Sequence, residues 1–183
     1  MSDRASALGA DFRTGLFGDT SDGAGVTLGE TFFDFVAELA AFPDAADKVE
    51  KLIGKATASV KTSLAFKIAR NRRLVAGMLD FRKKLEAGMS PGEASLVELT
   101  HGRSAFHING PKAEWVLAKL FPIDFSIEAF PVQSGLATTH HDIFTQIYRR
   151  HELSFDLFVF RSFARSFWHT LRRAAEETGY EVV

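Results

Sequence analysis

The stretch Phe155-Asp-Leu-Phe-Val-Phe-Arg-Ser-Phe-Ala-Arg-Ser-Phe-Trp168 decides the fold class of this 183-residue chain. Side chains alternate between the faces of a strand, so Phe155 and Leu157 lie on one face while Phe158 and Phe160 lie on the other. Because both faces are apolar, the strand must be covered twice. We expect the chain's own helices to cover one face. The second face is covered either by more of the chain's own core or by another subunit, and the spacing of the apolar residues slightly favours the core.

The same stretch supplies a candidate subunit interface. Ser162 is a typical N-cap residue and predicts a final helix, which places Phe163, Phe167 and Leu171 on one side. Gly179 is expected to end that helix. The candidate interface residues are Phe155, Phe158, Phe160, Arg161, Phe163, Phe167 and Trp168.

Outward from this stretch, residues 94–183 alternate between short strands and helices. This order predicts an α+β domain, a mostly antiparallel sheet with helices on one side. Gly110-Pro111 marks the start of the first helix, because proline is favoured at the first helical position. Strands are expected at 95–100, 105–108, 136–139, 143–148 and 155–160, with a turn at 101–103.

Residues 1–43 read as a glycine-rich tail followed by a short amphipathic helix. Six of the 14 glycines precede residue 30, and glycine has the most backbone entropy to lose on folding. From Thr31, a possible cap, apolar residues recur with helical spacing through 42. The segment is therefore predicted to be an N-terminal extension that ends in a helix.

Residues 44–93 are predicted to be a basic helical segment. Residues 44–86 carry a net charge of +6 in a chain whose net charge is −1. One apolar stripe runs from residue 49 to residue 68 and another from 74 to 85, with a break at 69–73. The pattern indicates either one long helix or a helical pair that folds back at the break. Solvated helix faces or protein contacts are favoured over nucleic acid as the reason for the charge.

Composition and motifs argue against most catalytic chemistry in this chain. There is no cysteine, which excludes disulfides, thiolates and cysteine-based metal sites. The phosphate-binding glycine motifs and the HExxH metal motif are both missing. We therefore expect no catalytic, cofactor-binding or metal-binding residues. The start of the chain lacks a secretory signal, no apolar run could span a membrane, and a cytoplasmic protein is expected.

Four segments in order resemble one protein family, the gamma subunit of heterotetrameric sarcosine oxidase and its equivalents in related N-methyl-amino-acid oxidoreductases. That family is related in fold to the folate-binding domain of the glycine-cleavage T-protein. The resemblance covers about 85 residues, and it rests on the order in which the four segments occur. The segments are Leu99-Thr-His-Gly-Arg103, Ile108-Asn-Gly-Pro-Lys-Ala-Glu-Trp-Val-Leu117, Phe121-Pro-Ile-Asp124 and Arg161-Ser-Phe-Ala-Arg-Ser-Phe-Trp168.

The resemblance implies a role as a non-catalytic structural subunit of an oxidoreductase complex. Its partners would be larger alpha and beta flavoprotein subunits and a small delta subunit. The complex carries FAD, FMN, NAD and zinc, uses tetrahydrofolate, and oxidatively demethylates an N-methyl amino acid to the amino acid and a one-carbon unit. No cofactor is implied for this chain, and no catalytic position is carried over to it.

Two alternatives remain open. The first is a free-standing folate-binding protein of the T-protein type. The second is a nucleic-acid-binding module, although few aromatic residues interleave with its basic residues. Those basic residues are Lys61, Lys67, Arg70, Arg72 and Arg73.

Overall fold

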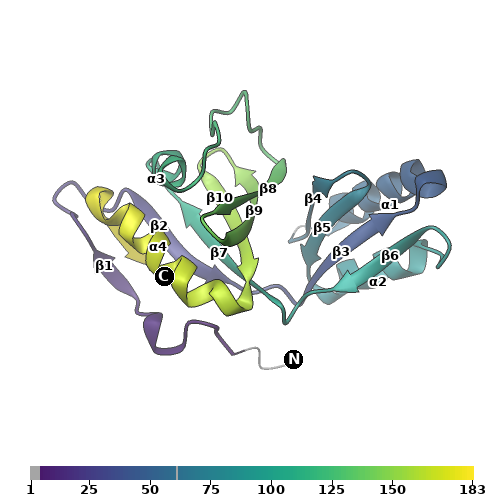
Figure 1. The fold of residues 1–183 in the computed structure, drawn as a ribbon, viewed down its shortest axis with the longest axis horizontal. Helices are drawn as coiled ribbons and strands as arrows, with labels where there is room; N and C mark the ends of the chain where they lie inside the picture. Colours follow the sequence, from purple (N-terminus) through teal and green to yellow (C-terminus); the bar gives the residue numbers. More distant parts are fainter. Residues whose placement is uncertain (1–4, 61) are drawn as a thin grey trace. The chain divides into compact units, whose positions relative to one another are not determined.

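The structure is a computed structural model that describes residues 5–60 and 62–183. The chain divides into two compact units (Figure 1). Met1–Phe32 and His101–Val183 together form what we call the split unit, and Phe33–Thr100 form the inserted unit. Each unit combines one sheet with two α-helices, and all neighbouring strands but one pair run antiparallel. The predicted α+β class is confirmed.

The split unit is built on a seven-stranded sheet with the order β1-β11-β2-β7-β10-β9-β8. Its one parallel pair is β11–β2, which brings the C-terminal strand beside the N-terminal segment. The predicted strands and helices of residues 103–183 are all present. The elements are β1 (Gly15–Phe17), β2 (Val26–Thr31), β7 (Arg103–Asn109), α3 (Ala113–Leu120), β8 (Gly135–His140), β9 (Ile143–His151), β10 (Ser154–Phe160), α4 (Ala164–Ala175) and β11 (Tyr180–Val182), with single 3-10 turns at Gly9–Asp11, Arg161–Phe163 and Glu176–Thr178.

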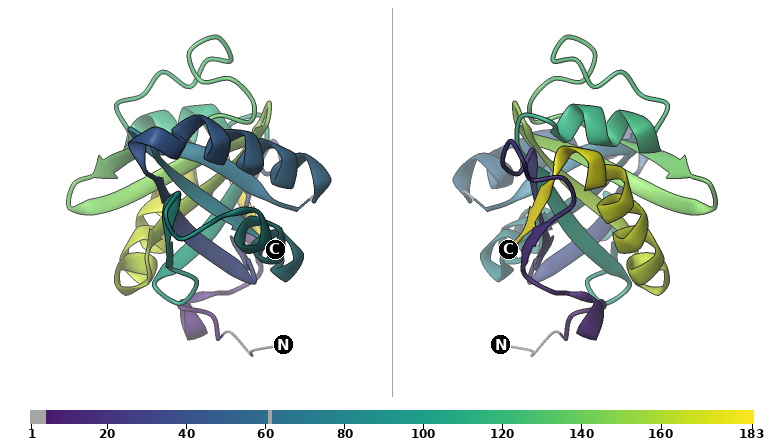
Figure 2. Two further views of the ribbon diagram at one scale, coloured as in Figure 1. Left: turned by 90° about the vertical axis from the view of Figure 1, so that its right-hand side faces the viewer. Right: turned by 90° about the vertical axis from the view of Figure 1, so that its left-hand side faces the viewer.

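Helices α3 and α4 share one face of this sheet, which we call the helix face, and they enclose the unit's main core with it (Figure 2). The predicted buried stripe of α3 is confirmed, since Ala113, Val116, Leu117 and Leu120 are all buried. Sheet side chains from β2, β7 and β10 meet these helices. The predicted arrangement, with helices on one side of the sheet, therefore holds for this unit.

Gly110 fixes where α3 begins. Its φ is +133°, and a Cβ at this position would lie 2.7 Å from the backbone oxygen of Gly25. The backbone N–H of Lys112 donates to that same oxygen at 3.1 Å. Only glycine allows so close an approach, so the predicted role of Gly110-Pro111 as a helix entry has a steric reason.

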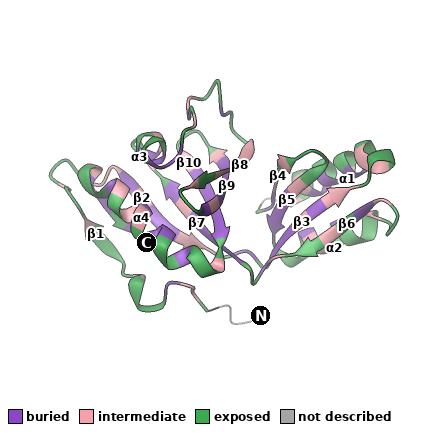
Figure 3. Cartoon of the chain, in the orientation of Figure 1, coloured by how far each residue is buried: buried purple, intermediate pink, exposed green. Residues whose placement is uncertain are grey.

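The inserted unit is a four-stranded antiparallel sheet with the order β4-β5-β3-β6, and helices α1 and α2 pack on it (Figure 3). Its core joins strands β3 and β5 to both helices. Across residues 5–60 and 62–183, no helix is long and apolar enough to cross a membrane. The elements are β3 (Phe35–Ala41), α1 (Ala46–Ser59), β4 (Leu64–Ala69), β5 (Arg72–Gly77), α2 (Leu79–Gly88) and β6 (Ala94–Glu98), with a 3-10 turn at Pro43–Ala45.

The helix predicted at 31–42 is wrong, because this segment is strand β3. Phe35, Val36 and Ala37 are buried in succession, so side chains on both faces of the strand are covered. Burial on both faces removes the alternation by which a strand is usually recognised, and leaves apolar spacing that also fits a helix. Pairing with β5 and β6 overrides the helix preference of this Ala/Glu/Leu sequence.

The all-helical prediction for 44–93 is also wrong in its middle. Helices α1 and α2 exist, but β4 and β5 form a hairpin between them and β6 follows α2. The predicted fold-back at 69–73 does occur, as the turn of that hairpin, with Asn71 at a φ of 55°. The extension expected to be helical is thus a second α+β unit. The pairing of strands that are distant in the sequence decides this outcome, and the residue pattern of a short segment does not reveal such pairing.

The domain boundaries and one helix cap also differ from expectation. The structure divides the chain at 32/33 and 100/101, whereas the sequence suggested segments 1–43, 44–93 and 94–183. Ser162 does not cap α4; it lies in a 3-10 turn whose backbone supplies the bond, from the N–H of Ala164 to the oxygen of Arg161. The backbone turn makes a side-chain cap unnecessary.

Replacing Gly54 by alanine is expected to stabilise the inserted unit by about 0.5–1 kcal/mol, since glycine within a helix costs that much relative to alanine. Gly54 is exposed in α1, and a Cβ there would meet no atom within 4 Å. Hydrogen exchange of the α1 amides should slow. Gly77→Ala in the same unit is the contrasting variant and should destabilise, because its Cβ would lie 2.9 Å from Cδ1 of the buried Phe81 and 3.1 Å from Cβ of the buried Ser63. Faster α1 exchange in Gly54→Ala would contradict this account.

Candidate functional site

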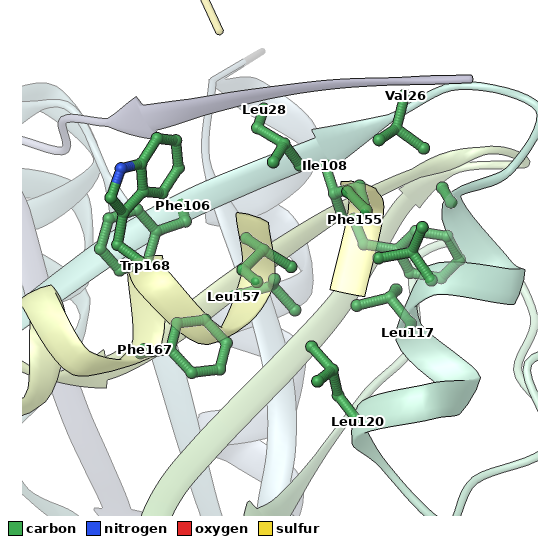
Figure 4. Close-up of a cluster of buried hydrophobic side chains, with 14 of the residues drawn as sticks. Val26, Leu28, Phe106, Ile108, Leu117, Leu120, Phe155, Leu157, Phe167 and Trp168 are labelled. Carbon is green, nitrogen blue, oxygen red and sulfur yellow. The ribbon is translucent and has the colours of Figure 1, made fainter. Parts of the chain in front are cut away.

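Four of the seven candidate interface residues are buried. Phe155, Phe167 and Trp168 belong to the core of the split unit, on its helix face (Figure 4). Phe158 is buried as well, with 0% of its surface exposed. These four side chains do not form a surface patch, so the seven candidate residues do not together form an interface.

Phe160, Arg161 and Phe163 do reach the surface, at the junction of β10 and α4. Phe160 and Phe163 are 40% and 39% exposed. Phe160 is held by the guanidinium of Arg103, whose Cζ lies 3.8 Å from the ring centroid. Arg161 Nη2 donates to the backbone oxygen of Ala5 at 2.9 Å. The interface remains a prediction for this group of three.

The face of the sheet opposite α3 and α4 carries a cluster of polar side chains that the sequence analysis did not find. Asp156 on β10 stands opposite His107 on β7, while Arg150 lies on β9. Arg150 Nε donates to Asp156 Oδ2 at 2.8 Å, and Nη2 lies 2.6 Å from the same oxygen. A signal was present, since Asp156 is the one charged residue of β10 and lies between apolar neighbours.

Gly29 makes the position of His107 possible. The two residues are paired across β2 and β7, and a Cβ on Gly29 would lie 2.2 Å from His107 Cε1. The imidazole therefore lies directly over the glycine backbone. Its Nδ1 is 3.2 Å from the hydroxyl oxygen of Thr31, and this contact fixes the rotation of the ring.

Burial sets the protonation preferences of this cluster. It raises the pKa of the Asp156 carboxyl, and the charge and hydrogen bond of Arg150 oppose that rise. Burial lowers the pKa of His107, and the nearby positive charge of Arg150 lowers it further. Burial also raises the pKa of Tyr148. The ion pair and the His107–Thr31 hydrogen bond satisfy the groups internally, which is the chemistry of a structural cluster.

His107 should make the split unit lose stability as pH falls. Its folded-state pKa lies below the ordinary value of 6.5, so the folded protein prefers the neutral ring. That contribution is complete above pH 6.5 and is lost as pH falls through 6.5 towards the folded pKa. Asp156 acts in the opposite sense, because its raised pKa favours the folded state as pH falls towards 3.8.

The measurement is the urea midpoint at pH 7.5 and pH 5.5 for the wild type and His107→Gln. Both tryptophans, Trp115 and Trp168, lie in the split unit, so their fluorescence reports its unfolding. The wild type should lose more stability than His107→Gln between the two pH values. Equal losses would show that His107 is not the responsible group.

A buried arginine on the helix face was likewise missed. Arg149 is 0% exposed, and its guanidinium donates to Glu114 Oε1 at 2.7 Å and to the backbone oxygen of Glu152 at 2.8 Å. It also donates to the backbone oxygen of Phe125. It therefore ties the 121–134 loop and α3 to the sheet. The sequence did not indicate this, because the strand was predicted to end at 148, whereas β9 extends through Arg149 to His151.

The basic residues of the nucleic-acid alternative are partly neutralised. Arg72 Nη2 lies 2.5 Å from Glu38 Oε1, and Arg73 Nε lies 2.6 Å from Glu50 Oε2. Lys67 and Arg70 are exposed on the β4–β5 hairpin, and Lys61 lies outside the described residues. Among the described residues, no group of three or more His, Asp or Glu is placed to hold a metal ion.

These features define an α+β protein whose described polar clusters are paired and which exposes two phenylalanines at the junction of β10 and α4. No protein-family model and no curated protein sequence matches the chain. A chain of the heterotetrameric sarcosine oxidase from Corynebacterium sp. U-96, solved in complex with pyrrole 2-carboxylate, matches with a TM-score of 0.78, 22% identity and coverage of 96% of both chains.

A second solved structure extends the same relationship. The glycine cleavage system aminomethyltransferase T from Bartonella henselae matches with a TM-score of 0.59 and 19% identity, over 87% of this chain. The chain spans about half of that protein, which is covered to 48%. The fold recognised from the sequence is thus confirmed: it is the fold of a chain of heterotetrameric sarcosine oxidase, shared with part of the T-protein.

Proposed function

We propose that this chain is a non-catalytic structural subunit of the gamma type in a flavin-dependent, sarcosine oxidase-type complex. The complex would oxidatively demethylate an N-methyl amino acid to the amino acid and a one-carbon unit. FAD, FMN, NAD and zinc would be held by the alpha, beta and delta subunits, and tetrahydrofolate would be used there. The complex would be cytoplasmic, in line with the expectation from the sequence.

The observation that carries the proposal is the two-way coverage of 96% with the sarcosine oxidase chain. A chain of the same extent and fold, with neither unit added nor missing, is what an equivalent subunit requires. The T-protein match covers only 48% of that protein, so this chain corresponds to a part of it. The sarcosine oxidase chain matches with the higher TM-score, 0.78 against 0.59, which favours the subunit over a free-standing T-protein.

The surface chemistry is consistent with a subunit. Phe160 and Phe163 are each about 40% exposed and lie at one junction with Arg161. Aromatic residues and arginine are the types enriched at protein interfaces. On the opposite face of the sheet, by contrast, Asp156 is paired with Arg150, and His107 is bonded to Thr31. Both points favour contact with other subunits over chemistry at this chain.

Co-expression tests the proposal. The full-length chain would be tagged and produced together with the flavoprotein subunits of a sarcosine oxidase-type complex from the same organism. We expect the chain to elute with those subunits at the size of a heterotetramer and to retain flavin absorbance. Elution of the tagged chain alone, with the flavoprotein subunits in a separate peak, would overturn the assignment.

The folate-binding alternative is supported by the shared fold with aminomethyltransferase T. The two hypotheses differ in what they predict for the isolated chain. If the chain is a structural subunit, calorimetric titration of the full-length chain with tetrahydrofolate should show no saturable heat. Saturable binding by the isolated chain would favour the folate-binding protein instead.

A further inference from the structure

Helix α4 carries a stripe of basic side chains at four-residue intervals, beginning in the turn before it. Arg161, Arg165, His169 and Arg173 follow one another along a single helix face, because residues four apart are neighbours on a helix. Arg165, His169 and Arg173 are exposed, and Arg161 is half-buried. We call these four residues the α4 stripe. Figure 2, in its right-hand view, shows α4 on the surface of the split unit beside the N-terminal segment.

The α4 stripe gains no support from acidic residues of its own helix. Residues 161–175 contain four arginines and no Asp or Glu, so the stripe has no acidic partner within α4. Arg161 and Arg165 are like charges four residues apart, which repel each other. Arg165 at the helix start also opposes the helix dipole, whereas Arg173 in the last turn is favoured by it. Arg161 and Arg165 find partners in the N-terminal segment. Among the described residues His169 and Arg173 have no ion pair or side-chain hydrogen bond, so a contact outside the chain would give these two a partner.

A pocket opens on the same side of α4, next to the stripe. Its lining includes Arg165, Trp168, His169 and Arg172, together with Asp11 of the N-terminal segment. The arginines and the indole are hydrogen-bond donors. Arg165 Nε already donates to Asp11 Oδ2 at 2.6 Å, which shows that a carboxylate is accepted here.

Trp168 adds an independent sign of a missing acceptor. Its side chain is 1% exposed, and its Nε1–H has no hydrogen-bond partner among the described residues. Buried tryptophan N–H groups usually find a partner, and an unsatisfied one costs free energy. Figure 4 shows the ring of Trp168 at the edge of the core. An indole N–H can only donate, and Trp168 also lines the pocket, so an acceptor that enters the pocket would complete it once the atoms over Nε1 shift.

We propose that the exposed face of α4 docks an acidic segment of a partner protein, with one of its carboxylates entering the pocket beside Trp168 and Arg165. The identification of that partner as a flavoprotein subunit rests on the proposed function. Charge complementarity selects the occupant, since the stripe is basic and the pocket presents donors.

A carboxylate suits this pocket better than a phosphate. Asp11 already contributes one negative charge to the lining, which disfavours a dianion more strongly than a single carboxylate. The Arg165 guanidinium has the fork geometry that matches carboxylates. Nucleic acid and anionic membranes are therefore the competing occupants that the test must separate from an acidic protein.

The first arm of the test measures binding by the full-length chain without any partner. The probe is a hexaglutamate peptide at low salt, and the variants are Arg165→Gln/Arg173→Gln and Trp168→Phe. We expect the double variant to weaken binding about tenfold, because each arginine loses a charge-assisted bond or a close charge. Trp168→Phe keeps the ring and removes the N–H, so it should weaken binding by severalfold.

The control is Lys51→Gln/Lys55→Gln, which removes two exposed charges four residues apart on α1. It should leave the affinity for hexaglutamate within about twofold of the wild type, as is usual for charges remote from an interface. Equal weakening by the α4 and α1 variants would overturn the inference. Tighter binding to a hexathymidylate oligonucleotide or to phosphatidylglycerol vesicles than to hexaglutamate would also overturn it.

The second arm repeats the co-expression with flavoprotein subunits. If the wild type and the α1 control co-elute with them and Arg165→Gln/Arg173→Gln does not, the docking surface is supported. If all three co-elute equally, the docking inference fails while the proposed function stands. If none of the three co-elutes but the α4 variants still bind hexaglutamate more weakly than the wild type, the proposed function fails and the docking site for an acidic segment stands.

Discussion

Replacement of Phe167 by alanine is expected to lower the free energy of unfolding of the split unit by about 3–5 kcal/mol, the usual cost of truncating a buried phenylalanine. Phe167 is 0% exposed on the inner face of α4. Its ring centroid lies 5.9 Å from that of Phe106 and 6.4 Å from that of Phe121. Truncation removes these contacts and leaves a cavity between α4 and the sheet.

Phe163→Ala is the matched control, since it is the same substitution one helical turn earlier. Phe163 is 39% exposed, so much less area returns to water on unfolding. We expect a loss of less than about 1 kcal/mol, typical of surface substitutions. Urea unfolding followed by tryptophan fluorescence compares the two. Similar losses in both variants would mean that α4 is not packed as described.

Replacement of Arg149 by methionine is expected to destabilise the same unit by about 3 kcal/mol or more, because each buried acceptor left without its donor costs ~1–3 kcal/mol. The backbone oxygens of Phe125 and Glu152 would both lose their donor. Glu114, whose side chain is 37% exposed, can turn to water and adds little. Methionine keeps much of the apolar volume of the arginine side chain, so the loss of stability measures the contribution of the guanidinium.

The readout for Arg149→Met has two parts. Urea unfolding gives the change in stability, and limited proteolysis tests whether the 121–134 loop opens. Cleavage in this loop should become faster in Arg149→Met and stay unchanged in Arg173→Met, where an exposed arginine is replaced. Unchanged cleavage together with full stability would show that the loop is held by other contacts.

The candidate site was predictable only in part. Phe160, Arg161 and Phe163 were named from the sequence and do reach the surface. Phe155, Phe167 and Trp168 were named with them but belong to the core. A run of aromatic residues shows that their apolar surface must be buried. It does not show whether the same chain or another subunit buries it. That distinction depends on where α3 and α4 lie.

The polar clusters could not be predicted for a related reason. Asp156 and Arg150 are six residues apart, and their pairing depends on the register of the β9–β10 hairpin. His107 joins them from a strand more than 40 residues earlier, above Gly29. A shift of one residue in any of these strands would put the side chains on opposite faces.

The sequence by itself determined the order of strands and helices from β7 to α4, the α+β class and the approximate start of α3. These depend on local signals, namely alternation, helical spacing and the Gly110-Pro111 pair. Only the tertiary structure decided that 33–100 is a second sheet-and-helix unit and that the strand following Gly25 pairs with the C-terminus. Strands buried on both faces carry no period of their own, so their identity is set by the distant strands that pair with them.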